Sequence, residues 1–253
     1  MKNIIIIPAR LNSSRLPGKV LLDLNGKTVV QRVYEQCIKV KNINDVYIAT
    51  DSEKVFNSCK SFTNNIILTK SVHESGTDRI AEAIQNIDCD NVINVQGDEP
   101  FIDHSLIEEV ISTFEISETN MISVMHKIKT IKELKNHNVV KVIVNNKNEA
   151  IYFSRSIIPH HRDEWNTLIN KHTNIPKELN FYRHIGIYGY KKDFLIKYSN
   201  MEQTYLERLE KLEQLRVIEN GYKIKMIITK NISIGIDTIE DYENAKLKIK
   251  GMK

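Results

Sequence analysis

Cysteine is scarce in this 253-residue sequence, which has three, at positions 37, 59 and 89, and no CxxC spacing. An odd count without paired spacing argues against both a disulfide framework and structural zinc. We therefore expect free thiols, as in a reducing compartment. Cys37 lies on an apolar helical face and is predicted to be a small core residue.

Long hydrophobic runs are also missing. The run Ile4–Ile7 covers only four residues and is followed by Pro8 and Arg10. A membrane-spanning helix needs about 20 apolar residues, so this run predicts a buried strand, and it does not resemble a signal peptide. We expect a cytoplasmic protein without membrane insertion.

Positive charge is not concentrated anywhere along the chain. The formal net charge is +4, but the lysines are scattered among aspartates and glutamates without a long basic run. This distribution argues against a nucleic-acid partner. A mild positive balance suits a small polyanionic ligand instead.

Strand and helix patterns alternate over the first half of the chain. Apolar residues recur at helical spacing between Val30 and Cys37, whereas residues 3–7, 46–49 and 92–95 are typical of buried strands. Alternating elements of this length predict an α/β fold with a doubly wound, mostly parallel, Rossmann-like sheet.

The pattern changes at about residues 139–200. Residues 140–144 and 150–153 alternate around a turn, which predicts a hairpin, and residues 181–190 form another alternating strand. Residues 160–180 resemble an irregular loop. We interpret this region as a smaller antiparallel insertion within a single domain that spans residues 1–253.

Two further elements are predicted near the end of the chain. Thr204 and Glu207 have the spacing of a capping box and predict the start of one long helix that ends at Asn220 and Gly221. Residues 234–236 are predicted to form a strand that ends at Asp237.

Ligands of open parallel sheets bind beyond the carboxyl ends of the strands. Arg10, Arg15 and Lys19 follow the first predicted strand within ten residues. Each arginine guanidinium can donate two parallel hydrogen bonds to phosphate oxygens, and the lysine adds a point charge. This combination suits a triphosphate. The loop has neither the Walker A pattern nor GxGxxG, and a solvated basic loop is the alternative interpretation.

Carboxylates follow other predicted strands. Asp98 comes directly after residues 92–95, and Asp237 is predicted to end a later strand. Magnesium usually takes one or two carboxylates together with phosphate oxygens, so these aspartates are a candidate pair of ligands. The alternative for Asp237 is a helix N-cap, and Thr238 with Asp241 offers a competing cap.

The segment Ser75–Arg79 precedes a predicted helix, where amides and hydroxyls could bind a phosphate or a base edge, or simply cap the helix. A second candidate site lies on the strand at residues 181–190. Tyr182, His184, Gly186, Tyr188 and Tyr190 share one face of this strand, which suits a polyhydroxylated ligand.

Three residues elsewhere are candidates for contacts with such a ligand. Arg155 could clamp a carboxylate, and Glu213 and Gln214 lie together on the predicted long helix. Most helical Glu-Gln pairs are solvated surface residues. No Ser-His-Asp or Cys-His arrangement is suggested, which fits a direct phosphoryl-group transfer that depends on positioning and charge.

Seven segments, taken in order, closely resemble the 3-deoxy-manno-octulosonate cytidylyltransferases, the CMP-Kdo synthetases of the sugar nucleotidyltransferase superfamily. These segments are Ile7–Lys19, His73–Arg79, Asn94–Pro100, Tyr152–Arg155, Arg183–Tyr190, Leu212–Arg216 and Gly235–Thr238. Together they extend over nearly the whole chain, and a series of this length is far more specific than any one motif.

The resemblance implies residue roles. It implies nucleotide binding by Ala9, Arg10, Arg15, Lys19, Ser75, Gly76, Thr77, Arg79 and Asp98. It implies sugar-acid binding by Gln96, Arg155, His184, Tyr188, Glu213 and Gln214. It implies magnesium ligation by Asp98 and Asp237, and catalytic roles for Arg10, Lys19, Asp98 and Asp237. It also implies a homodimer formed through the smaller antiparallel region.

The activity that the resemblance implies is the magnesium-dependent joining of CTP to 3-deoxy-D-manno-octulosonate (Kdo). The products would be CMP-Kdo, for lipopolysaccharide or capsule, and pyrophosphate. Departures from the family pattern at Val20, Ser13–Ser14, Tyr205 and His160–His161 leave the sugar open between Kdo, its 8-amino analogue and another 2-keto sugar acid. A non-catalytic nucleotide-binding regulator is the alternative of another class. Both aspartates and all three loop cations are retained, which argues against it.

Overall fold

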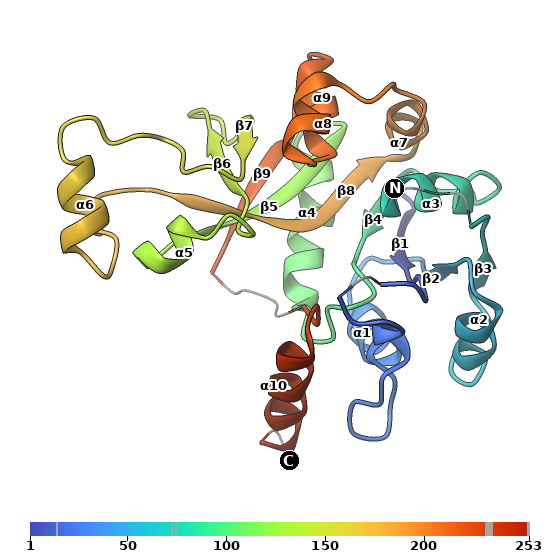
Figure 1. Ribbon diagram of the computed structural model, residues 1–253. Helices are drawn as coiled ribbons and strands as arrows, with labels where there is room; N and C mark the ends of the chain where they lie inside the picture. The colour runs from blue at the N-terminus through green and yellow to red at the C-terminus, as the bar shows by residue number, and fades with distance from the viewer. Residues whose placement is uncertain (14, 72, 74, 231–234, 252–253) are drawn as a thin grey trace. The chain divides into compact units, whose positions relative to one another are not determined.

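Strand β1 (Asn3–Pro8) is an inner strand of a mostly parallel sheet in the computed structural model (Figure 1). The structure describes residues 1–13, 15–71, 73, 75–230 and 235–251. The strand order around β1 is β3 (Ile66–Leu68), β2 (Asp45–Thr50), β1, β4 (Asn91–Asn94) and β8 (Tyr182–Lys191). The first four are parallel, and β8 runs antiparallel to β4. The predicted α/β class with a mostly parallel sheet is confirmed.

The chain divides into two compact units. The first takes in the described parts of residues 1–116, 187–199 and 232–253, and the second those of residues 117–186 and 200–231. Strand β8 therefore contributes residues to both units. The predicted insertion at residues 139–200 is shared between them, and its role in sugar binding and dimerisation stays a prediction.

The core of the first unit follows from the sequence pattern. Ile4–Ile7 are fully buried, and the Thr28 side chain accepts a hydrogen bond from the Gln31 amide at the start of α1 (Val29–Cys37). The helical elements of this unit besides α1 are η1 (Lys19–Leu21), α2 (Glu53–Cys59), α3 (Gly76–Ala83), α4 (His104–Ile116), α7 (Lys192–Ser199) and α10 (Ile239–Lys250). All three cysteines are buried and free.

The second unit contains the predicted hairpin. Strand β6 (Lys141–Val144) pairs antiparallel with β7 (Ala150–Ser154) and with β8. Strand β5 (Met121–Lys127) lies between β8 and β9 (Lys225–Thr229), and its pairing with β9 is parallel.

Residues 160–180 of the second unit are more ordered than the sequence predicts. They contain α6 (Trp165–Lys171), which buries Leu168 in a cluster with Ile128, Leu134 and Phe181. The cluster also receives Ile131 from α5 (Ile131–Lys135). The prediction of a wholly irregular loop is wrong because tertiary burial, rather than local pattern, stabilises this short helix. None of the helices in the described residues has the length and apolar character to span a bilayer.

The prediction of one long helix after Thr204 is wrong. The chain forms α8 (Tyr205–Glu210) and α9 (Gln214–Glu219), separated at Lys211, which has a left-handed φ of 54°. Glu207 of α8 and Arg216 of α9 form a buried ion pair, with 2.8 Å between Arg216 Nε and Glu207 Oε2. The two short helices fold back on each other around this pair, and the sequence has neither glycine nor proline at the break.

The Glu207–Arg216 pair is expected to contribute strongly to stability. Arg216→Met leaves the Glu207 carboxylate, 4% exposed, buried without its counter-ion. Removing one partner of a buried pair costs about 3–5 kcal/mol, and we expect that loss in the free energy of unfolding measured by urea denaturation. Arg162→Met is the control, because Arg162 pairs with Asp163 at the surface and exposed pairs contribute about 0–1 kcal/mol. Equal small losses in both variants would contradict the prediction.

Candidate functional site

Lys19 lies between two aspartates of the first unit. Its Nζ donates hydrogen bonds to Asp98 and, over 2.7 Å, to Asp237 Oδ1. Arg15 Nη2 lies 3.1 Å from the other oxygen of Asp237. The structure therefore brings together four of the predicted residues, two cations and two carboxylates, from three distant segments.

The charge on Lys19 is stabilised by this arrangement. Partial burial alone would lower the pKa of Lys19, but the charges and hydrogen bonds of Asp98 and Asp237 outweigh it and raise the pKa above its ordinary value. Lys19 is therefore an ammonium ion that neutralises part of the charge of both aspartates. The sequence predicted Lys19 for phosphate binding and gave no sign of this second set of partners.

The main chain explains how the segments meet. A Cβ on Gly97 would lie 2.8 Å from the Pro8 carbonyl oxygen, so only glycine lets the loop after β4 approach the loop after β1 this closely. The Ile236 amide donates to the Asp98 carbonyl oxygen over 2.8 Å. These contacts hold the segments of Lys19, Asp98 and Asp237 together.

Asp237 does not end a strand in the part of the chain that the structure describes. Residues 235–237 are irregular, and Ile234, the start of the predicted strand, lies outside the described residues. Thr238 is the N-cap of α10 and forms a capping box with Asp241. The N-cap interpretation of Asp237 is therefore wrong, and its carboxylate is available to Lys19.

The other loop residues differ in their surroundings. Ala9 is buried and its amide donates to the Ala49 carbonyl over 2.8 Å, which extends the pairing of β1 and β2. Arg10 follows as an exposed side chain, and no residue in the described ranges forms an ion pair with it. Arg10 is thus a cation that can meet an anionic ligand without breaking an internal contact.

The segment Ser75–Arg79 forms the start of α3. Ser75 is the N-cap, and its side chain accepts a hydrogen bond from the Asp78 amide over 3.1 Å. Gly76 and Thr77 are in the first turn. Arg79 is buried and donates to Thr69 over 2.6 Å and to Asp51 over 2.8 Å. The side chains of Ser75 and Arg79 are therefore engaged inside the unit, and the nucleotide role of this segment stays a prediction.

His184 is held in the second unit. Its Nε2 lies 2.8 Å from Ser123 Oγ, and its ring contacts Phe153 edge-on with 5.0 Å between centroids. Burial, with a smaller effect of the Arg183 charge, lowers the pKa of His184 to about 3. The imidazole is therefore neutral at neutral pH and suits hydrogen bonding to a hydroxyl rather than to a carboxylate.

The remaining second-unit candidates lie near the break between α8 and α9. Arg155 Nε donates to the Glu210 carbonyl over 2.8 Å, so its guanidinium binds the carboxyl end of α8. Glu213 is half-buried just before α9, and Gln214 is only 3% exposed. The solvated-surface interpretation is therefore wrong for Gln214.

Two candidates for sugar binding belong to the first unit. Gln96 Nε2 donates to Asn94 Oδ1 over 3.2 Å. The ring of Tyr188 stacks on Tyr190, with 5.8 Å between centroids. The sugar-binding roles of these two residues, like those of the second-unit candidates, stay predictions.

Lys141 is a buried cation that sequence reasoning missed. Its Nζ donates to the carbonyl oxygens of Asn136, Val139 and Arg155 over 3.1, 2.7 and 2.6 Å. Burial lowers the pKa of Lys141 below its ordinary value. The alternating pattern of β6 placed this lysine on the polar face, and its full burial next to Arg155 has no local sequence signal.

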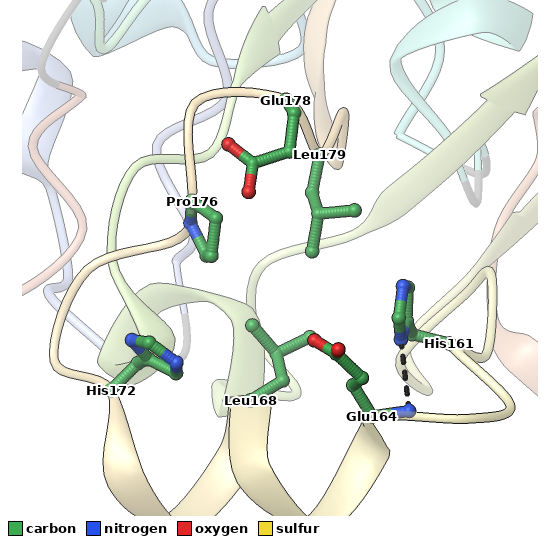
Figure 2. Close-up of a pocket in the computed structure, with 7 residues that line it drawn as sticks. All are labelled: His161, Glu164, Leu168, His172, Pro176, Glu178 and Leu179. Carbon is green, nitrogen blue, oxygen red and sulfur yellow. Dashed lines mark hydrogen bonds between the residues drawn. The ribbon is translucent and has the colours of Figure 1, made fainter.

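A separate pocket of about 240 Å³ lies in the second unit and contains none of the predicted site residues (Figure 2). It is lined by His161, Glu164, Leu168, His172, Pro176, Glu178 and Leu179. Figure 2 shows the two histidines on opposite sides of the pocket. No group of three or more potential metal-ligating side chains converges in the described residues, those of this pocket included.

A parallel sheet with a cationic loop after β1 and a nearby pair of aspartates is typical of nucleotide-binding α/β proteins, whose ligands lie beyond the carboxyl ends of the strands. The family model described as cytidylyltransferase matches residues 4–226. The chain is 44% identical over 251 residues to the 3-deoxy-manno-octulosonate cytidylyltransferase of Geotalea uraniireducens, covering 99% of this chain and all of that one. It is 44% identical over 245 residues to the Fusobacterium nucleatum enzyme of the same name, covering 96% and 95% of the two chains.

Solved structures of cytidylyltransferases also resemble this chain. CMP:2-keto-3-deoxy-manno-octonic acid synthetase complexed with CTP superposes with a TM-score of 0.91 over the full length of both chains, at 34% identity. A cytidylyltransferase from Leptospira borgpetersenii, at 18% identity and a TM-score of 0.64, covers 99% of this chain and 87% of that one and shares the fold alone. The chain therefore belongs to the cytidylyltransferase family, and within it to the 3-deoxy-manno-octulosonate cytidylyltransferases.

Proposed function

We propose that this protein joins CTP to Kdo and forms CMP-Kdo and pyrophosphate. The observation that carries the proposal is the convergence of Arg15 and Lys19, which follow β1, with Asp98 and Asp237. Full-length relatives that bear the name of this activity support it.

The residues fit a magnesium ion. Asp98 and Asp237 direct carboxylate oxygens at one shared cation, the ammonium of Lys19. Two carboxylates supplemented by phosphate oxygens are the usual ligand set of Mg²⁺ in nucleotide enzymes. When bound there, Mg²⁺ would neutralise triphosphate charge and polarise the α-phosphate. Two carboxylates alone do not fill the coordination sphere of Mg²⁺, so the nucleotide phosphates would supply the other ligands.

The proposed reaction is an in-line displacement. The anomeric 2-hydroxyl of Kdo attacks the α-phosphorus of CTP and loses its proton to solvent, and pyrophosphate leaves with the electron pair of the broken P–O bond. Arg10, Arg15 and Lys19 stabilise the charge on the leaving group. Arg10 is exposed and Arg15 is held only at the surface, with 62% of its side chain accessible, so both can turn toward a triphosphate.

The sugar acid is proposed to contact Gln96, Arg155, His184, Tyr188, Glu213 and Gln214. A neutral imidazole, a phenol and two amides match the hydroxyls of a polyhydroxylated sugar, and an arginine matches its carboxylate. This part of the proposal rests on the chemistry of the side chains and on the family.

The test is release of pyrophosphate from CTP, Mg²⁺ and Kdo, with ATP and UTP as controls. Release only with CTP and Kdo, abolished by EDTA, supports the proposal. Release only with 8-amino-Kdo or another 2-keto sugar acid would replace the substrate. Calorimetric binding of CTP without turnover on any sugar acid would favour a non-catalytic regulator.

We also propose a cytoplasmic homodimer. Free buried thiols at all three cysteines support the reducing compartment. Ile151 of β7 supports the dimer, since it exposes 52% of its surface within the region predicted to mediate the contact.

Ile151→Lys is expected to weaken the dimer at least about tenfold, because a contact of two copies would bury the ammonium against apolar surface. Light scattering coupled to size-exclusion chromatography measures this as a function of concentration. Ile38→Lys is the matched control, because Ile38 is 53% exposed in the first unit. A dimer unaffected by Ile151→Lys would argue against β7 as the interface.

A further inference from the structure

Helix α10 begins at Ile239, after its N-cap Thr238, and the side chain of Asp241 in its first turn reaches back to Asp237. Asp241 Oδ2 accepts hydrogen bonds from the Thr238 amide over 2.9 Å, from the Thr238 hydroxyl over 2.8 Å and from the Asp237 amide over 3.1 Å. An ordinary capping box needs only the bond to the N-cap amide. The additional bond to the Asp237 amide is not needed for capping.

The chain on the other side of Asp237 is held as well. The Ile236 amide donates to the Asp98 carbonyl over 2.8 Å, and the Ile236 side chain is fully buried against Ala245 and Ile249 of α10. The two peptide groups that flank the Asp237 Cα donate through the Asp237 and Thr238 amides to Asp241, and the preceding peptide donates through the Ile236 amide to Asp98. This leaves the side-chain torsions as the main remaining freedom of Asp237.

We infer that Asp241 is a positioning residue of this site, which holds the backbone of Asp237 so that its carboxylate stays beside Lys19, the cation that it shares with Asp98 and whose place a metal ion would take. The inference rests on the proposed function, because it deepens the role of Asp237 there. Asp241 acts through Asp237 and does not contact the substrate. Outer partners that orient a metal ligand typically affect metal affinity or activity by about 10–100-fold.

The experiment compares two variants of the same cap. Asp241→Ala removes the bonds to both amides and to the hydroxyl, whereas Thr238→Ala removes the cap hydroxyl and leaves the carboxylate on the Asp237 amide. Both variants lose N-cap interactions of α10 and are expected to lower Tm by similar amounts. Asp241→Asn keeps one acceptor oxygen and serves if the alanine variant fails to fold.

Two measurements are made on each variant: binding of Mn²⁺ in the presence of CTP, by electron paramagnetic resonance, and kcat with separate KM values for CTP and Kdo. For Asp241→Ala we expect Mn²⁺ affinity and kcat to fall about 10–100-fold, with the KM for Kdo unchanged. For Asp241→Asn we expect an intermediate loss. For Thr238→Ala we expect both quantities within about threefold of the unmodified protein, because the geometry of Asp237 is kept.

Equal effects of Asp241→Ala and Thr238→Ala on Mn²⁺ affinity would overturn the inference and reduce Asp241 to a helix cap. Absence of Mn²⁺ binding to the unmodified protein with CTP would overturn it as well. If the unmodified protein binds Mn²⁺ and CTP but releases no pyrophosphate with Kdo, the substrate proposal fails. A difference in Mn²⁺ affinity between the two alanine variants then still supports the positioning role.

Discussion

Asp98→Asn and Asp237→Asn are each expected to lower the turnover of CTP and Kdo by about 10²–10³-fold, while the fold stays intact. Each aspartate supplies a charged oxygen at the point where the triphosphate and its metal would lie, and removing one preorganised electrostatic group costs a factor of this size. Asparagine has almost the same shape and can still accept a hydrogen bond from Lys19.

The measurement is pyrophosphate release at saturating CTP and Kdo across a series of Mg²⁺ concentrations. Circular dichroism and thermal unfolding report the fold. Asp88→Asn is the matched control, since the Asp88 carboxylate is 95% exposed and forms a surface pair with Lys2 at 3.3 Å; the turnover of this variant should stay within about twofold of normal. Near-normal turnover in both Asp98→Asn and Asp237→Asn would remove the metal assignment from these residues.

Much of the architecture could be predicted because it depends on local patterns. The buried run Ile4–Ile7, the helical face of α1 and the hairpin of β6 and β7 all follow from periodicity over a few residues. The cationic loop and Asp98 could be found in the same way, because ligands of parallel sheets bind beyond the carboxyl ends of the strands.

The parts that could not be predicted depend on partners distant in the sequence. Lys19 and Asp237 are 218 residues apart, and Arg79 and Asp51 are 28 residues apart. The break at Lys211 depends on an ion pair between α8 and α9 rather than on glycine or proline. Capping residues such as Ser75 and Thr238 can be read from sequence, but whether they also serve a ligand depends on these long-range contacts.

Lys19 occupies the carboxylate oxygens of Asp98 and Asp237 that a metal ion would need. Two aspartates share its ammonium ion, and Asp98 keeps only 22% of its side chain exposed. In the absence of nucleotide, a divalent cation must therefore compete with Lys19 for the same carboxylate oxygens. Under the proposed function, a bound triphosphate would offer Lys19 other anionic partners, so that Lys19 could release the two aspartates to the metal ion.

Lys19→Met is accordingly expected to separate metal affinity from turnover. Turnover should fall about 10²–10³-fold, because a cation that stabilises the leaving pyrophosphate is lost. The affinity of the nucleotide-free protein for Mn²⁺ should rise about tenfold, because two partly buried carboxylates are left without their ammonium partner. Electron paramagnetic resonance measures the free Mn²⁺, and pyrophosphate release measures turnover.

Lys27→Met is the control, since Lys27 pairs with Glu35 over 2.6 Å outside this cluster. This substitution should change neither the Mn²⁺ affinity nor the turnover. If Lys19→Met lowers both turnover and Mn²⁺ affinity, then Lys19 supports the metal site instead of competing for it, and the exchange of partners on nucleotide binding is wrong.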